Sequence, residues 1–213
     1  MEHNQETPIE PINISLNEFG VFDQNNFVVL DDAKHVIGID ASDAGNLIIE
    51  NVKNSKAKKF TVTKFDNKHI KNLYYHEDTN SLYCGDFNGQ LYKYKVNFKR
   101  KTCEKYNYYG DLGIGWIISS HRFLQFVFFG GSEKKIKVLD LSSDQLLPGN
   151  LDTSIEYIYS LKVCVKSLKE IYLAVSGAGF DYSDDKTDLF EVSSILHNDT
   201  VNLRKYYSTF SID

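Results

Sequence analysis

One segment carries the clearest structural signal in this chain of 213 residues: Leu82-Tyr-Cys-Gly85-Asp86-Phe-Asn88-Gly89-Gln-Leu91-Tyr-Lys-Tyr94. Its two halves are rich in apolar and aromatic residues, which favour the half-buried surface of a β-sheet. Between them, Asn88-Gly89 predicts a tight hairpin of type I′, in which both turn residues take positive φ. Asp86 stands where its carboxylate can accept hydrogen bonds from the turn backbone. The segment therefore predicts a strand, a tight turn and a second strand.

The same pattern returns 45 residues later, in a segment that runs from Phe126 to Asp140. Three parts of the two segments align at that one spacing, and a constant spacing of this kind indicates an internal repeat. The aligned parts are Gly85 with Gly130, Leu91 with Ile136, and residues 70–73 with residues 115–118.

Weaker copies of the unit flank this pair. On the N-terminal side they comprise residues 36–40 and 45–49, and on the C-terminal side residues 158–161, 171–177 and 189–192. The last alignment needs an insertion of about seven residues, which the acidic loop around 181–185 supplies. Further extended segments at 12–19, 58–65, 102–109 and 201–210 give four strands per unit. Turn signals interrupt the chain every 8–12 residues, and no long stretch has helical periodicity.

The predicted organisation is a flexible polar N-terminal tail, residues 1–11, followed by repeats over residues 12–213. The units cover about 12–57, 58–101, 102–145 and 146–213. The fold class is all-β, and units of 40–45 residues with four strands each are typical of propeller blades. A β-sandwich stays open as the alternative, although it gives no reason for a constant spacing of 45 residues.

The unit resembles the WD40 repeat in its order: apolar strand, Gly-Asp, short glycine turn, apolar strand and acidic end. Leu139-Asp140 stands where that family has Trp-Asp, Tyr94-Lys95 takes the same place in the preceding unit, and the Gly-His that opens the family's repeat is missing. The resemblance covers residues 12–210 and is strongest over 60–140. It implies a β-propeller-like array of about four four-stranded blades. The structural turn positions are then Gly85, Asp86, Gly89, Gly130 and Asp140.

The length of the chain raises a question of ring closure. A seven-bladed ring at this period needs roughly 300 residues. The chain is therefore a part of a longer protein, an oligomer that completes a ring, or a small closed ring. In an open array the two end blades expose apolar faces, which are surfaces for association.

Composition argues against several classes of function. The net charge is −5, and only Arg100, Arg122 and Arg204 among the 24 basic residues are arginine, so a nucleic-acid partner is not expected. The N-terminus has no apolar signal region, and no apolar run approaches the ~20 residues of a membrane helix. We therefore expect a cytoplasmic protein with no membrane partner. The three cysteines, at 84, 103 and 164, have neither zinc-site nor disulfide-framework spacing.

Motifs that carry chemistry are incomplete. Residues 181–187 place oxygen side chains as in an EF-hand loop but lack its glycine and its final glutamate, so we expect an acidic loop without calcium. The glycines of 110–115 do not continue as a phosphate-binding motif, and indicate a turn between units. Ser120 and His121 are neighbours in a strand and point to opposite faces. We expect no catalytic residues, no metal and no cofactor.

The aromatic residues leave two interpretations open. Trp116, the only tryptophan, and tyrosines near strand ends either pack in the core or anchor a protein partner, since these residue types are enriched at binding hot spots. The candidate partner-binding residues are Trp116, Tyr74, Tyr108 and Tyr157. The function expected first is a non-enzymatic scaffold that binds other proteins. The alternatives are a structural subunit that completes a propeller in an oligomer or a larger complex, and a propeller-fold enzyme.

Overall fold

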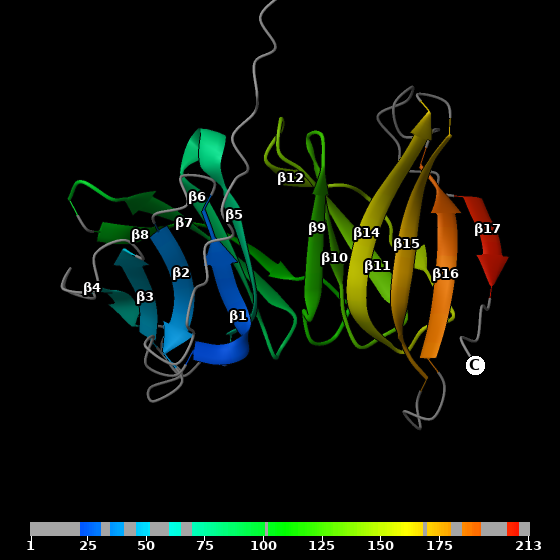
Figure 1. Cartoon of the computed structure of the whole chain (residues 1–213), viewed down its shortest axis with the longest axis horizontal. Coiled ribbons are helices and arrows are strands. Elements are labelled where there is room, and N and C mark those ends of the chain that lie inside the picture. Colours follow the sequence, from blue (N-terminus) through cyan, green and yellow to red (C-terminus); the bar gives the residue numbers. More distant parts are fainter. Residues whose placement is uncertain are drawn as a thin grey trace, which may run out of the picture.

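The computed structural model describes residues 22–30, 35–40, 46–51, 60–64, 70–100, 102–167, 170–179, 185–192 and 204–208. Within these residues the fold is all-β and consists of four antiparallel sheets (Figure 1). Each sheet is built from consecutive strands, and each strand pairs with its neighbour in the sequence except β13, which pairs with β11. No helix in the described part of the chain is long and apolar enough to cross a membrane.

The first sheet contains β1 (Phe22–Val29), β2 (His35–Asp40), β3 (Asn46–Asn51) and β4 (Phe60–Lys64). The second contains β5 (Ile70–His76), β6 (Ser81–Asp86), β7 (Gln90–Asn97) and β8 (Thr102–Asp111), with a 3-10 turn, η1 (Glu77–Thr79), after β5. The third contains β9 (Ser119–Phe123), β10 (Phe126–Gly130), β11 (Lys135–Asp140) and the short β12 (Gln145–Leu146) and β13 (Leu151–Asp152). The fourth contains β14 (Tyr157–Ser167), β15 (Glu170–Ala178), β16 (Asp185–Glu191) and β17 (Arg204–Ser208).

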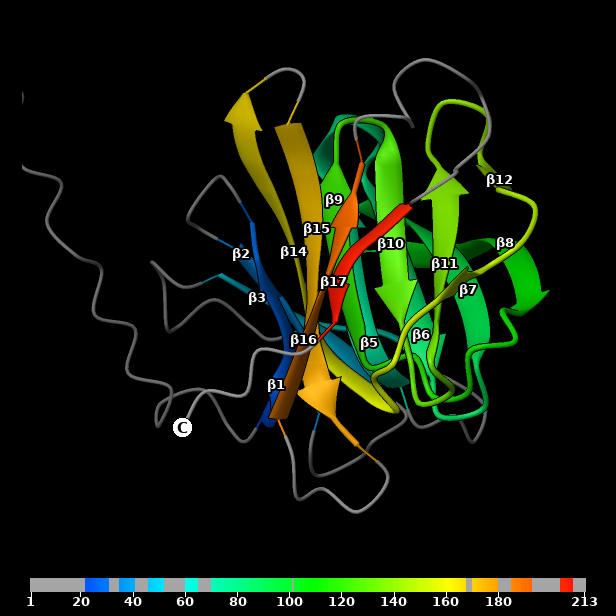
Figure 2. The ribbon, with the colours of Figure 1, turned by 90° about the vertical axis from the view of Figure 1, so that its right-hand side faces the viewer.

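The sheets stand in sequence order, and the first strand of each contacts the first strand of the next: β1 lies against β5, β5 against β9, and β9 against β14. Figure 2 views this row from the side of the fourth sheet. Three apolar cores fill the spaces between consecutive sheets. Among the described residues no core joins the fourth sheet to the first, so the row is open there.

The central strands explain why the repeat signal is so apolar. All five residues of β10 are buried, because alternate side chains enter the cores on both faces of the third sheet: Val127 and Phe129 pack toward the second sheet, Phe126 and Phe128 toward the fourth. A fully buried side chain of this size contributes about 1.5–3 kcal/mol to stability. In β15 of the fourth sheet, by contrast, buried and half-buried residues alternate.

Neighbouring sheets are joined by a repeated contact between a glycine and an isoleucine. A Cβ atom built on Gly85 would lie 2.5 Å from Cγ2 of Ile117, and one built on Gly130 would lie 2.6 Å from Cγ2 of Ile158. Only glycine leaves room for this approach. The two glycines hold the same position in adjacent sheets, since Gly85 pairs with Leu91 and Gly130 with Ile136. This confirms the equivalence that the spacing of 45 predicted.

Hydrogen bonds fix the same contact. The N–H of Ile117 donates to the carbonyl of Asp86 (3.2 Å), and the N–H of Ile158 donates to the carbonyl of Gly131 (3.0 Å). The side chains opposite the glycines add a second bond: Asn72 donates to the carbonyl of Ile118 (3.4 Å), and Ser119 donates to that of Ile158 (3.0 Å). We call this set of contacts the inter-sheet latch. It occurs between the second and third sheets and again between the third and fourth.

The hairpin between β6 and β7 is tight, as predicted, and Asp86 holds it. Oδ1 of Asp86 accepts hydrogen bonds from the N–H groups of Asn88 and Gln90, both at 2.8 Å. The predicted type I′ turn is wrong, because Gly89 (φ +75°) has positive φ and Asn88 does not. The N–H of Gly89 bonds to the carbonyl of Asp86 (3.3 Å), which describes a three-residue loop that ends in a left-handed glycine.

The predicted alignment of residues 70–73 with 115–118 is wrong. Leu73 pairs with Cys84, and the residue in the same place of the third sheet is Ser120, which pairs with Phe129. The spacing is therefore 47 rather than 45 at this strand, and β9 begins only at 119. The cause is the connection to the second strand, which has four residues after β5 but only two after β9.

The first two sheets also end one strand later than the first two predicted units. They span residues 22–64, 70–111, 119–152 and 157–208, because β4 pairs with β3 and β8 pairs with β7. The strands predicted to open two of the units thus close the preceding sheets. The first strand of the first sheet, β1, was not predicted, and the predicted strand at 12–19 and the tail 1–11 lie outside the described residues.

We expect Gly89→Ala to lower the free energy of unfolding by about 1 kcal/mol more than Gly149→Ala. Both glycines have positive φ (+75° and +77°), so both substitutions carry backbone strain of about 1 kcal/mol. Only at Gly89 would the new Cβ also lie 2.7 Å from a backbone oxygen, that of Gly115, whereas nothing lies within 4 Å at Gly149. Denaturant melts measure both values, and equal losses would contradict this description of the turn.

Candidate protein-interaction site

Three aromatic side chains come together at one end of the second, third and fourth sheets. Phe87 lies in the β6–β7 turn, Trp116 in the connection before β9, and Tyr157 at the start of β14. The rings of Phe87 and Trp116 are stacked, with centroids 4.0 Å apart and an interplanar angle of 28°. The Tyr157 ring lies 6.5 Å from that of Trp116 at 58°. We call these three residues the aromatic patch.

The inter-sheet latch places the aromatic patch. Trp116 directly precedes the latched Ile117, Tyr157 directly precedes the latched Ile158, and Phe87 directly follows Asp86, whose carbonyl accepts the bond from Ile117. The N–H of Trp116 is itself fixed by the hydroxyl of Ser132 at 3.0 Å. The backbone of the aromatic patch is therefore held by the same bonds that hold the sheets together.

A buried carboxylate holds the segment that leads to Tyr157. Asp188 of β16 is fully buried and accepts hydrogen bonds from the Thr153 hydroxyl (2.7 Å) and from the N–H of Ser154 (2.7 Å). The Thr153 hydroxyl in turn accepts from the N–H of Ile155, which is buried in the core between the third and fourth sheets. No local pattern in the sequence points to Asp188, because its partners lie 34 and 35 residues away.

Two rings of the aromatic patch remain exposed despite their mutual contact. Phe87 keeps 37% of its surface in solvent and Trp116 keeps 38%, while Tyr157 is half-buried. Exposed Trp beside other aromatic rings is typical of binding hot spots. Phe87 was not among the predicted site residues, although an aromatic residue within a glycine turn is a usable signal, since it has no strand face to pack on.

The other two predicted aromatics lie elsewhere. Tyr74 packs in the core between the second and third sheets, 5.8 Å from the Tyr83 ring, and burial raises its pKa to about 12. Tyr108 is exposed on the outer strand β8, stacked on Tyr92 and bonded to Gln90. Among the described residues no ring contact joins either tyrosine to the aromatic patch.

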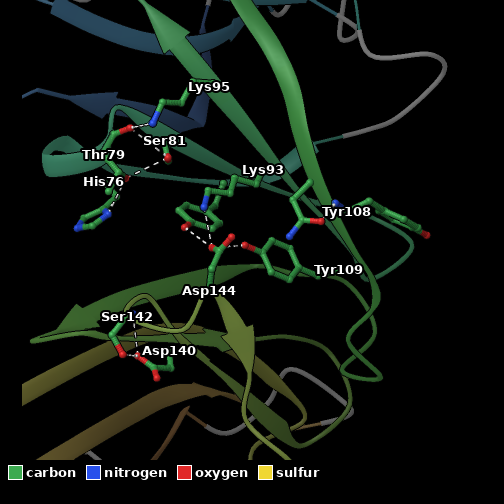
Figure 3. Close-up of polar contacts among 12 residues, drawn as sticks. His76, Thr79, Ser81, Lys93, Lys95, Tyr108, Tyr109, Asp140, Ser142 and Asp144 are labelled. Atoms are coloured by element: carbon green, nitrogen blue, oxygen red, sulfur yellow. Dashed lines mark hydrogen bonds and ion pairs between the residues drawn. The ribbon is translucent and has the colours of Figure 1, made fainter.

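A second polar cluster centres on Asp144 and joins the second sheet to the third (Figure 3). Its Oδ1 atom accepts from Lys93 Nζ (2.7 Å), from the Tyr109 hydroxyl (2.6 Å) and from the Tyr83 hydroxyl (3.4 Å). Lys93 is buried, with its ammonium 5.5 Å from the centre of the Tyr83 ring. Burial, together with the Asp144 carboxylate, raises the pKa of both tyrosines, so their hydroxyls stay protonated as donors.

Asp140 sets the turn that presents Asp144. It ends β11, and its carboxylate accepts bonds from the N–H and hydroxyl of Ser142 (2.9 and 2.7 Å) and from the Ser143 hydroxyl (2.9 Å). Burial raises the pKa of Asp140, but these bonds outweigh it and hold the pKa below its ordinary value. The pair Leu139-Asp140 therefore has two roles: Leu139 is fully buried in the core between the second and third sheets, and Asp140 holds the turn that follows.

The described residues hold few groups with catalytic or metal-binding character. Within them, no group of three or more His, Cys, Asp and Glu is arranged to hold a metal ion. Of the acidic loop, residues 181–184 lie outside the described part, while Asp185 and Thr187 belong to β16. Cys84 and Cys103 are buried thiols, Cys164 is exposed, and burial raises the pKa of the first two.

We expect Asp144→Ala to lower the free energy of unfolding by about 2 kcal/mol, because it leaves the buried Lys93 ammonium without its carboxylate. Asp78→Ala is the control. Asp78 also faces cationic partners, Arg122 at 3.5 Å and His76 at 3.3 Å, but 74% of its side chain is exposed, so a loss of at most about 0.5 kcal/mol is expected. Thermal and denaturant melts compare the two. Similar losses in both variants would show that the Asp144 cluster does not join the sheets.

No family model matches this chain, and no curated protein matches it. Solved structures do resemble it. One is a chain of a crystal structure of the mitotic checkpoint complex, with a TM-score of 0.60 and 14% identity over 82% of this chain and 47% of that chain. Another is the computationally designed Ika8 protein, with a TM-score of 0.55 and 13% identity over 84% and 48%. The chain thus spans about half the length of these structures, and the likeness concerns the fold alone.

Proposed function

We propose that this chain is part of a WD40-type β-propeller that binds other proteins through the aromatic patch and catalyses no reaction. The observation that carries the proposal is the exposed stack of Phe87 on Trp116, which shares one end of the sheets with Tyr157. Aromatic side chains that are already ordered lose little entropy on binding, so they are efficient anchors. A neighbour in fold from the mitotic checkpoint complex, a multi-protein assembly, is consistent with this role.

The propeller assignment is supported by the repetition of both sheet and interface. Four consecutive sheets, three of four strands and one of five, contact one another through their first strands. The inter-sheet latch occurs twice, each time with a glycine, an isoleucine and a backbone hydrogen bond between the sheets. Radial repetition of four-stranded sheets about their inner strands is the architecture of a propeller.

To test the binding site, peptides selected from a displayed random library against the whole chain are titrated while the fluorescence of Trp116, the only tryptophan, is recorded. We expect Phe87→Ala to weaken the selected peptides at least about tenfold, because truncation of a hot-spot aromatic costs more than about 1.4 kcal/mol. Trp116→Ala, followed by calorimetry, is expected to do the same.

The matched control is Leu124→Ala, which removes another exposed apolar side chain (51% exposed) at the opposite end of the third sheet. Its affinity is expected to equal that of the unchanged chain. If all three variants bind the selected peptides equally well and remain folded, the aromatic patch is not the binding site and the proposal fails.

A second candidate function is that of a structural subunit whose end sheet is covered by another part of a ring. The fourth sheet favours it. The centre of its outward face carries Tyr172, Ala174, Ser176, Thr187 and Leu189, all half-exposed and uncharged, and the same register places Lys162, Asp185 and Glu191 around them. In contrast, β6 and β10 are buried on both faces. The uncharged centre of this face is the part that another sheet would cover.

If this face associates, light scattering is expected to give a mass above the 24.4 kDa of one chain. Leu189→Asp places a charge in the middle of the face and is expected to restore a mass of 24.4 kDa. Lys162→Glu, at the exposed edge of the same face, serves as the control and is expected to leave the larger mass unchanged. A mass of one chain for the unchanged protein would count against the structural role.

A further inference from the structure

We propose that the aromatic patch binds a basic segment of its partner, with an arginine side chain lying on the exposed face of Trp116. This inference rests on the proposed function and names the chemistry of the partner. Its basis is a set of three exposed carboxylates near the patch.

Two carboxylates lie near Gly115, the residue before Trp116. A Cβ on Gly115 would lie 2.9 Å from Cγ of Glu133, so the Glu133 side chain runs along this backbone. A Cβ on Gly89 would lie 2.7 Å from the Gly115 oxygen and 2.8 Å from Oδ1 of Asp111, so Asp111 lies close to the Gly115 carbonyl. Both acidic residues are exposed. They therefore face solvent next to the exposed tryptophan.

A third carboxylate lies in the fourth sheet, two strands from Tyr157. Tyr157 pairs with Ala178 in the fourth sheet, and Ala178 pairs with Asp185, which is exposed. Two lysines lie next to these carboxylates in the sequence. Lys134 is paired with Glu156 (2.8 Å), and Lys186 follows Asp185. Within the described residues, neither Glu133 nor Asp185 forms an ion pair.

An exposed aromatic ring with carboxylates nearby favours a cation that can also stack on the ring. The face of an aromatic ring attracts a cation, and a planar guanidinium can lie on that face while its N–H groups reach carboxylates beside it. The chain already contains the same chemistry, since the Lys105 ammonium lies 5.0 Å from the centre of the Tyr92 ring. An acidic or phosphorylated segment would be repelled by Glu133, Asp111 and Asp185. The whole chain also carries a net negative charge of −5, which adds to this repulsion.

The test uses the peptides selected on the whole chain. We expect them to be enriched in arginine, and replacement of that arginine by citrulline, its uncharged isostere, to weaken binding about tenfold. The double variant Glu133→Gln with Asp185→Asn is expected to weaken the arginine peptide about three- to tenfold and the citrulline peptide hardly at all. The control is Glu104→Gln, an exposed acid on the outer strand β8, which is expected to change neither affinity.

The outcomes separate this inference from the proposed function. If the selected peptides need Trp116 but contain no arginine, or bind equally well with citrulline, the inference of a basic partner is overturned. The aromatic patch then still stands as the binding site. Peptides that bind without Trp116 overturn both. Salt adds an independent measurement, because the affinity of the arginine peptide is expected to fall between 0.05 and 0.5 M NaCl, roughly the range over which surface charges become screened.

Discussion

The close approach of an isoleucine to a glycine is the constraint on which the arrangement of the sheets depends. Gly130 is the last residue of β10 and Gly85 the last but one of β6, and any side chain at either position would occupy the space of Ile158 or Ile117. Because the first strand of one sheet can approach the central strand of the sheet before it, backbone groups reach hydrogen-bonding distance across the interface. The apolar cores then fill the remaining space.

The same constraint has a consequence at the surface. Each latched isoleucine is preceded by an aromatic residue that cannot enter the core, since the latch already directs the next side chain inward. Trp116 and Tyr157 are therefore held at the end of the sheets by the packing that stabilises the fold. Asp144 acts on the interface between the second and third sheets from another position, through Lys93, Tyr83 and Tyr109. A rigid interface of this kind keeps the aromatic patch ordered in the absence of a partner.

The sequence predicted the parts of this fold that depend on local chemistry. The equivalence of Gly85 and Gly130 and the tight hairpin at Asp86–Gly89 follow from turn residues and strand alternation. What could not be predicted depends on connections and distant partners. The register of β9 shifted because its hairpin is two residues shorter, and β1 was missed because Asp23-Gln-Asn-Asn26 interrupts its apolar pattern. Phe87 joins Trp116 only through the stacking of two sheets, which no local pattern encodes.

Every core in the described part of the chain forms between sheets that follow each other in the sequence. During synthesis, a sheet that leaves the ribosome finds the surface it packs against already made, and it needs no segment that is still to be translated. Each added sheet covers the face exposed by the one before, so growth from the N-terminus can proceed with only one unfinished apolar face at the growing end. The order of the sheets is in this sense also an order of assembly.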